Sequence, residues 1–405
     1  MFTKPFDEIT KADIDTLIAE GTPEGRELEF KAELPKSGNP KDKGEFAKDV
    51  SAFANAVGGY IVYGIAERQD TAGNSTGLYD AVGLPGITKA DTEITRLEQM
   101  ILSNIAPRIY GIRLKAIDGF PQGPVFVLHI PKSWNAPHMV TTDNSRFFSR
   151  RNALSMAMDV QEIRSAFVLS AEMPALIRRF RDERLGRIMA EDTPVKLKKG
   201  ARVVTHVVPF ASMAMDTKGI DFDLVDNESP APPRGRDWDR RFNFDGWVSY
   251  SGPEQGAQRS YLQVFRSGAL EATVAYDEPP TNIRFYFAPW EIEETTLTAL
   301  ARYLKFHEKH GVEPPVVVAV SLLGFKDATI YPRDPYPSRT RDEDVYIVDR
   351  DTLLLPDILV RDFGGALPTL MRPAFDALWQ AAGASKSLSY DETGRWSRDE
   401  HKRRL

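Results

Sequence analysis

The sequence predicts an α+β protein with two folded domains. Over the first 180 residues, stretches with helical apolar spacing are mixed with short β-branched and aromatic runs. From residue 203 onward, strand-like runs follow one another with few helical stretches between them. A chain of 405 residues also exceeds what a single hydrophobic core usually organises. We therefore expect domains at 1–184 and 185–384, followed by a polar, disordered tail over 385–405.

Apolar spacing and turn residues define the elements of the first domain. Residues 45–57 have apolar side chains at helical spacing, and Gly58-Gly59 is typical of a helix end. Residues 60–66 are almost all apolar, as in a strand buried on both faces. The other predictions are helices at 12–20, 91–105 and 159–180, strands at 28–34, 112–116 and 124–130, and loops at 36–44 and 68–76. Together they predict a mixed sheet with packed helices.

The second domain is predicted to be richer in strands. Residues 316–322 are nearly all β-branched, which indicates a buried strand, and 295–310 has one apolar stripe, which indicates a helix. The remaining predictions are strands at 203–211, 247–251, 259–266, 268–276, 283–287 and 345–348, a helix at 373–382, and loops at 226–234 and 331–344.

Composition excludes several classes of protein and site. No apolar run approaches 18 residues, so no membrane span is expected, and the absence of cysteine excludes thiolate zinc sites and fits a cytoplasmic protein. The sequence contains neither the Gly-x4-Gly-Lys-Ser/Thr pattern of phosphate-binding loops nor the Gly-x-Gly-x-x-Gly pattern of dinucleotide-binding domains. We therefore expect no nucleotide cofactor. A net charge of −6 means that any nucleic-acid site is a local patch.

An acidic cluster is the main functional signal. Glu24, Glu27 and Glu29 lie within six residues and are followed by Lys31. On a strand, Glu27 and Glu29 share a face, whereas Glu24 reaches the same site only if the chain bends at Gly25. Two carboxylates suffice to hold Mg²⁺ beside a phosphate. The alternative is a solvated, charged strand without function, and on the residues alone this alternative is favoured.

An ordered series of motifs resembles a known family. The series is Glu24 to Lys31, a basic loop, Phe53-Ala-Asn55 with Gly58-Gly59, Tyr63-Gly64-Ile65, and finally Arg146 to Arg151 before an acidic helix. Residues 10–170 in this order resemble the Schlafen-type AlbA-like domain. Bacterial relatives of this kind are described as DNA-binding or ATP-binding proteins, and the second description is discounted here for lack of a phosphate-binding motif.

The resemblance implies a metal-dependent endoribonuclease with three acids. Two glutamates spaced five apart are catalytic in the ribonucleases of this family, and here they are Glu24 and Glu29. The third acid follows the glycine-containing strand. Glu67 is our candidate, with Asp70 as the fallback, although the family usually has aspartate there. The three acids would bind Mg²⁺ or Mn²⁺, and Lys31 would neutralise charge on the phosphate. A salt bridge from Lys31 to Glu29 or Glu33 is an equal alternative.

A second group of residues is predicted to bind nucleic acid. Alternation on a strand places Arg146, Phe148 and Arg150 on one face and Arg151 on the other. A basic face with an aromatic side chain suits a phosphate backbone and a stacked base. The alternative buries Phe148 in the core and leaves the arginines as surface charges. Lys36, Lys41 and Lys43, in the predicted loop, would add non-specific phosphate contacts, although simple solvation explains them better.

These patterns leave three functional hypotheses. The first is an endoribonuclease acting on tRNA or other structured RNA, with a role in bacterial defence. The second is a non-catalytic nucleic-acid-binding or regulatory protein with the same fold. The expected partner is nucleic acid, with RNA preferred and DNA possible. The third is an assembly scaffold whose C-terminal domain recognises a partner. Exposed sheet edges favour a homo-oligomer.

Overall fold

The computed structural model describes residues 1–405 except 1, 3, 70, 72–74, 143–144, 215–218, 223–224, 226–229, 253–255, 279–284, 331–345, 382 and 398–405. The fallback acid Asp70, residues 226–229 of the predicted loop at 226–234, the whole predicted loop at 331–344 and the end of the predicted tail lie outside the described residues. The chain forms two compact units, Met1–Met173 and Pro174–Leu405.

The first unit combines helices with three small sheets, which confirms the predicted α+β class. Its helices are η1 (Phe6–Glu8), α1 (Lys11–Ala19), α2 (Pro40–Asn55), α3 (Ala90–Asn104) and the first part of α4 (Val160–Met189). Its strands are β1 (Leu28–Lys31), β2 (Gly58–Tyr63), β3 (Ile65–Gln69), β4 (Ser75–Ala81), β5 (Ile105–Ala106), β6 (Arg113–Phe120), β7 (Gly123–Pro131), β8 (Met139–Val140), β9 (Arg146–Arg151) and β10 (Leu154–Ala157).

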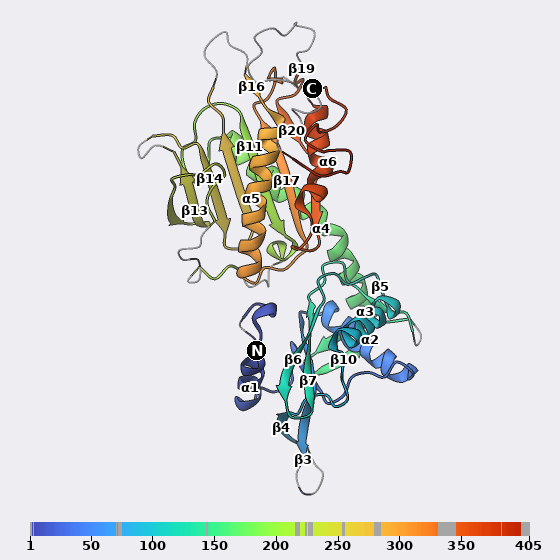
Figure 1. Ribbon diagram of the computed structural model, residues 1–405. Coiled ribbons are helices and arrows are strands. Elements are labelled where there is room, and N and C mark those ends of the chain that lie inside the picture. The colour runs from blue at the N-terminus through green and yellow to red at the C-terminus, as the bar shows by residue number, and fades with distance from the viewer. Residues whose placement is uncertain are drawn as a thin grey trace. The chain divides into compact units, whose positions relative to one another are not determined.

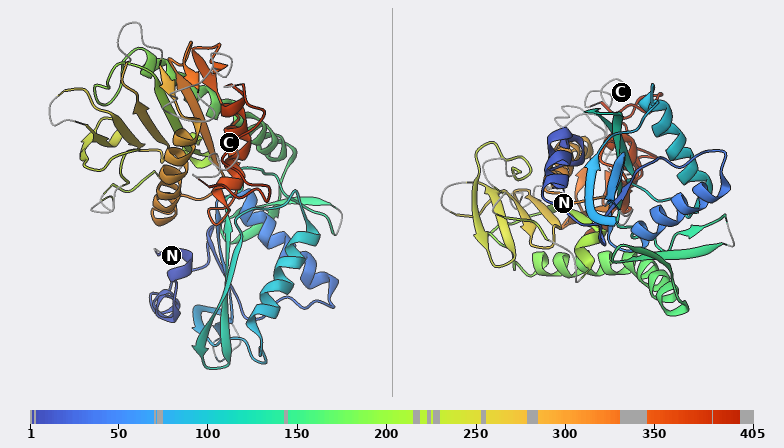
Figure 2. Two further views of the ribbon diagram at one scale, coloured as in Figure 1. Left: turned by 45° about the horizontal axis from the view of Figure 1, so that its top comes forward. Right: turned by 90° about the horizontal axis from the view of Figure 1, so that it is seen from below.

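The main sheet of this unit is mixed and is covered on both faces. Its order is β1-β2-β7-β6, with β1 parallel to β2 and the other pairs antiparallel. One face packs on α2 and α3 through a core that includes Phe53, Ile61 and Phe126, and the other packs on α1 through Ile14 and Phe30. Figure 2 shows α1 and the α2–α3 pair on opposite sides of these strands. Strand β1 is left at the edge of the sheet.

Helix α2 begins five residues earlier than the sequence predicted. The Asn39 side chain accepts a hydrogen bond from the backbone N–H of Lys41 at 3.0 Å, and Pro40 occupies the first turn. Asn-Pro was interpreted as part of a loop, but the same two residues form a favourable helix start. Lys41 and Lys43 are therefore helical residues.

The β3–β4 hairpin is not apparent from the sequence. Residues 68–76 were predicted to be a loop, whereas β3 reaches Gln69 and β4 starts at Ser75. The polar, exposed residues that end β3 hid the strand, because period-two alternation is lost where both faces are in water. Glu67 lies on this hairpin, opposite Tyr79.

The second unit contains a large sheet whose neighbouring strands are antiparallel throughout the described residues (Figure 1). Its strands are β11 (Arg202–Pro209), β12 (Asp239–Asn243), β13 (Gly246–Ser251), β14 (Ser260–Phe265), β15 (Leu270–Ala275), β16 (Tyr286–Phe287), β17 (Val316–Leu323), β18 (Thr329–Ile330), β19 (Tyr346–Ile347), β20 (Thr352–Leu354) and β21 (Ile358–Val360). Its helices are η2 (Phe210–Met213), α5 (Pro289–Lys309), α6 (Leu367–Gln380) and the second part of α4. The eight-stranded sheet has the order β12-β13-β14-β15-β11-β17-β20, with β21 also paired to β17.

Alternation along the strands divides this sheet into two buried faces. Val203 and Val207 of β11 belong to the core under α5 and α6, while Val204 and Val208 pack with residues of α4 on the other face. Figure 1 shows α5 and α6 side by side on the sheet. The boundary predicted at residue 184 falls inside α4, a helix that continues from one unit into the other.

Residues 385–397 pack on the second unit, whereas the sequence predicted a disordered tail from 385. Ser387 and Tyr390 are buried, and the Trp396 indole N–H donates to Glu293 Oε2 at 2.8 Å. The Ser387 hydroxyl donates to the other oxygen of Glu293, at 2.7 Å. The polar composition of this segment was misleading because its polar groups bond to a buried carboxylate.

No helix in the described part of the chain is both long enough and apolar enough to cross a bilayer.

Candidate functional site

The open edge of β1 is covered by two side chains that the sequence singled out. The outward backbone N–H of Phe30 donates to Glu24 Oε1 at 2.8 Å. The outward carbonyl of Leu28 accepts from Arg150 Nη2 at 3.2 Å, and Arg150 Nε donates to the Gly25 carbonyl at 2.9 Å. An edge strand exposes such groups unless something pairs with them. Glu24 and Arg150 therefore close the edge of the sheet.

Glu29 lies in a buried ion-pair network. Its Oε2 accepts from Arg150 Nη1 at 2.6 Å, and its Oε1 lies 2.5 Å from Lys31 Nζ. Lys31 Nζ also lies 3.1 Å from Asp49 Oδ2, and the Ser155 hydroxyl donates to Asp49 Oδ1 at 3.0 Å. Arg150 is only 2% exposed and Glu29 8%. The network joins β1, α2, β9 and β10.

Burial and mutual charge shift the pKa values in this network. Burial raises the pKa of the Glu29 carboxyl and the charge of Asp49 raises it further, against the opposing effect of Lys31 and Arg150. Burial lowers the pKa of the Lys31 ammonium, but Asp49 and Glu29 outweigh it, so the pKa lies above its usual value. Burial also raises the pKa of the Tyr63 hydroxyl well above normal, and the two carboxylates add to this. Lys31 is thereby held in its charged form.

Asn55 uses its amide to attach β8 and β9 to the end of α2. Its Nδ2 donates to the carbonyls of His138 at 2.9 Å and Phe148 at 2.8 Å, and its Oδ1 accepts from the His138 backbone N–H at 2.7 Å. The His138 ring is buried against Pro107 O and Ser133 Oγ, and burial lowers its pKa to about 4. Asn55 and His138 thus have structural contacts.

The three predicted metal ligands are not brought together as one site. Glu29 is engaged by Arg150 and Lys31, while Glu24 and Glu67 both lie close enough to Tyr79 to raise the pKa of its hydroxyl, after the larger effect of burial. Within the described ranges, no three His, Asp or Glu side chains form a group that could hold a metal ion. Glu24, Glu29 and Glu67 are thus not part of such a group in the described residues, and a Mg²⁺ or Mn²⁺ centre that uses Asp70 stays a prediction.

Strand β9 separates the predicted nucleic-acid-binding residues into two kinds. Arg146 and Arg151, at its ends, are exposed. Phe148 is half-buried against the α2–α3 core, and Arg150 lies inside the ion-pair network with its guanidinium carbon 4.3 Å from the Phe53 ring centre. The predicted binding face of Arg146, Phe148 and Arg150 is therefore wrong for the last two, because their side chains pack toward the core, whereas Arg146 at the start of the strand is exposed.

The lysines that were predicted to contact phosphate differ in their exposure and in their acidic neighbours. Lys36 is exposed and its Nζ lies 3.4 Å from Glu33 Oε2. Lys41 is exposed near the start of α2, and Lys31 retains 38% exposure despite its two acidic partners. All three can reach solvent, and the predicted Lys31–Glu29 salt bridge is present.

Sequence reasoning missed Asp49 and Ser155. Asp49 shares a helical face with Phe46, Val50 and Phe53, which pack into the core. An acid within an apolar stripe is a signal of a buried partner. No comparable signal exists for Ser155, whose position depends on the β9–β10 pairing.

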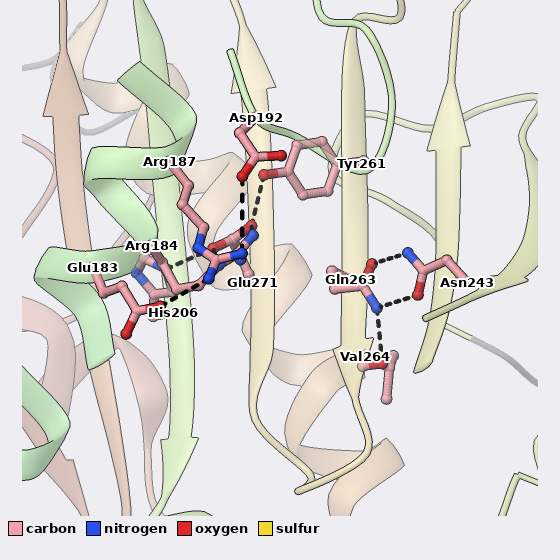
Figure 3. Close-up of polar contacts among 10 residues, drawn as sticks. All are labelled: Glu183, Arg184, Arg187, Asp192, His206, Asn243, Tyr261, Gln263, Val264 and Glu271. Carbon is pink, nitrogen blue, oxygen red and sulfur yellow. Dashed lines mark hydrogen bonds and ion pairs between the residues drawn. The ribbon is translucent and has the colours of Figure 1, made fainter. Parts of the chain in front are cut away.

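The second unit has a buried polar cluster that the sequence also did not reveal (Figure 3). Glu271 is fully buried, and its two oxygens accept from Arg184 at 2.8 and 3.0 Å. Tyr261 donates to Glu271 Oε1 at 2.7 Å, and His206 Nε2 lies 3.1 Å from Oε2. Arg184 belongs to α4 and the others to strands. The cluster attaches α4 to the sheet.

Comparison with known proteins adds one finding about the first unit. Residues 24–159 match the family model described as Schlafen, AlbA_2. This stretch carries a Schlafen AlbA_2 domain. The match confirms the resemblance predicted from Glu24, Glu29, Asn55 and the β9 arginines. It begins at Glu24, whose carboxylate covers the edge of β1.

Two other comparisons add little. No curated protein matches the chain. Among solved structures, the N-terminal domain of a DNA helicase RecG-related protein from Nitrosomonas europaea is 22% identical, over 30% of this chain and 71% of that one. The TM-score is 0.23, so this likeness supports no structural argument.

Proposed function

We propose that the Schlafen AlbA_2 domain binds nucleic acid, RNA in preference to DNA, without cleaving it. The main support is that both oxygens of Glu29 are already paired, one with Lys31 and one with Arg150. A carboxylate neutralised in this way repels a phosphate backbone far less than an unpaired one. Glu24 and Glu29, two of the acids that point to a metal site in the sequence, thus have structural contacts that are compatible with binding.

Exposed cations of this domain supply the phosphate contacts in our proposal. Arg146 and Arg151 lie at opposite ends of β9, and the buried Arg150 between them holds the strand in place. Arg151 already pairs with Glu162, an exposed contact that costs little to exchange for phosphate. Arginine suits this role because its planar guanidinium can bind two phosphate oxygens.

Fluorescence anisotropy with labelled single-stranded RNA and DNA over a range of salt concentrations tests this proposal. The double variant Arg146→Ala/Arg151→Ala should bind RNA about tenfold more weakly. Its slope of log affinity against log salt should fall by about 0.7 for each lost phosphate contact. Lys89→Ala removes an exposed cation from the same domain and serves as the control. Equal loss in both variants, or no binding by the unmodified protein, would contradict the proposal.

A metal-dependent endoribonuclease is the second candidate. The observation that favours it is the closeness of Glu24 and Glu67 to Tyr79, because Mg²⁺ can be held by only two carboxylates with water and phosphate. Incubation of labelled tRNA with Mn²⁺ or with chelator separates the two candidates. We expect intact RNA in both tubes. Cleavage with Mn²⁺ that is abolished in Glu24→Gln/Glu67→Gln would establish the enzyme instead.

A further inference from the structure

The part of α4 in the first unit presents an apolar surface to solvent. Val160 is 72% exposed, Phe167 53% and Val168 48%. At 3.6 residues per turn, these three side chains lie within about one third of the circumference of the helix. Large exposed apolar side chains gathered on one side of a helix are typical of an interaction surface. We call the exposed side of Val160–Glu172 the α4 face.

The helix that carries the α4 face is held against its own unit by packing contacts. The ring of Phe167 packs edge-on against Phe147 of β9, with 6.1 Å between ring centres. Met173, six residues further along, is fully buried. A helix held in this way keeps its exposed side chains in a fixed arrangement, which lowers the entropic cost of an interface.

Charges on the α4 face have a self-complementary pattern. Arg164 and Glu172 are both exposed and lie four residues to either side of Val168. Residues spaced by four lie along one side of a helix. When two identical helices cross antiparallel at Val168, Arg164 of each copy lies at the height of Glu172 of the other. A parallel pair would instead place like charges at the same height.

We propose that the α4 face pairs two copies of this chain in an antiparallel arrangement centred on Val168. Val168 and Phe167 form the apolar centre of this interface, and two symmetry-related Arg164–Glu172 ion pairs flank it. A two-fold interface uses the same patch on both copies, which requires such self-complementarity. This explains why a single exposed patch carries both signs of charge around an apolar centre. The proposal is independent of nucleic-acid binding.

Analytical ultracentrifugation of the full-length chain and of charge-swap variants tests the pairing. Arg164→Glu and Glu172→Arg should each weaken dimerisation at least about tenfold, because each single reversal opposes like charges at two symmetric positions. The double variant Arg164→Glu/Glu172→Arg restores opposite charges and should dimerise within about threefold of the unmodified protein. Val168→Glu should be monomeric.

Glu98→Arg is the matched control, because Glu98 is exposed on α3 of the same unit. It should leave dimerisation unchanged, and circular dichroism should show all variants folded. A monomeric unmodified protein overturns the proposal, as do single reversals that dimerise normally. A double variant that stays as weak as the single ones overturns the charge pairing.

Discussion

At the scale of single residues, Arg150 belongs to a motif that predicts nucleic-acid binding, but its buried side chain makes contacts that support the fold. Its guanidinium bonds to the backbone at Gly25 and Leu28 and to the carboxylate of Glu29. The bonds to Leu28 and Glu29 belong to β1, the edge strand of the main sheet. A buried charge with this many partners fixes the position of β9 relative to β1. Its removal leaves the Glu29 carboxylate without one of its two counter-charges.

Arg150→Met should destabilise the first unit by about 3–5 kcal/mol, since the methionine keeps part of the volume but leaves a buried carboxylate less neutralised. Urea unfolding followed by circular dichroism measures the change. Arg146→Met, on the same strand but exposed, should change stability by less than about 0.5 kcal/mol. Similar losses for the two variants would show that the buried network contributes nothing special.

At the scale of elements, the backbone at the start of β2 lies very close to the backbone that leads into β1. Gly59 has φ = +147°, and a Cβ there would lie 2.3 Å from the carbonyl oxygen of Glu27. That carbonyl accepts the backbone N–H of Tyr60 at 2.8 Å, which begins the parallel pairing of β1 with β2. The sequence predicted Gly58-Gly59 as a helix end. The tight approach to β1 is a second reason for glycine.

Two glycine substitutions should therefore have opposite effects. Gly59→Ala should destabilise the first unit by several kcal/mol, about 3, because a backbone oxygen cannot move aside without breaking the β1–β2 pairing. Gly44→Ala, inside α2 with no atom within 4 Å of its Cβ, should stabilise it by about 0.5–1 kcal/mol through helix propensity. Thermal melting of the two variants compares them directly, and equal shifts would refute this account.

At the scale of the whole molecule, each unit is held together by its own buried charge network. Glu29 with Arg150 joins β1 to β9 in the first unit, and Glu271 with Arg184 joins the sheet to α4 in the second. Burial opposes ionisation of Glu271, but hydrogen bonds from His206 and Arg184 outweigh it and lower its pKa to about 2. The pKa of the Glu29 carboxyl is raised, whereas that of the Glu271 carboxyl is lowered. The stability of the two units should therefore change differently as the pH falls.

The second unit should lose stability as the pH falls from about 5 to 2. A carboxyl whose pKa is about 2 when folded and 4.5 in its reference state contributes stability above pH 4.5, and this is lost as it becomes protonated. The contribution is roughly 3 kcal/mol at neutral pH. Glu271→Gln should be less stable at pH 7 and show a shallower fall toward pH 2 in urea unfolding. An unchanged pH profile in this variant would contradict the role of Glu271.

The sequence by itself determined the α+β class, most of the buried strands and the Schlafen AlbA_2 resemblance. Apolar periodicity and glycine positions are local signals. Residues such as Phe53, Ile61 and Gly59 occupy the kinds of position that these signals predict. Tertiary structure alone decided that Glu29 pairs with Arg150, since these residues are 121 positions apart. It also decided that Trp396 bonds to Glu293 across 103 positions, so that residues 385–397 pack. The physical reason is that burial and charge neutralisation depend on which strands meet, and spacing along one segment does not encode this.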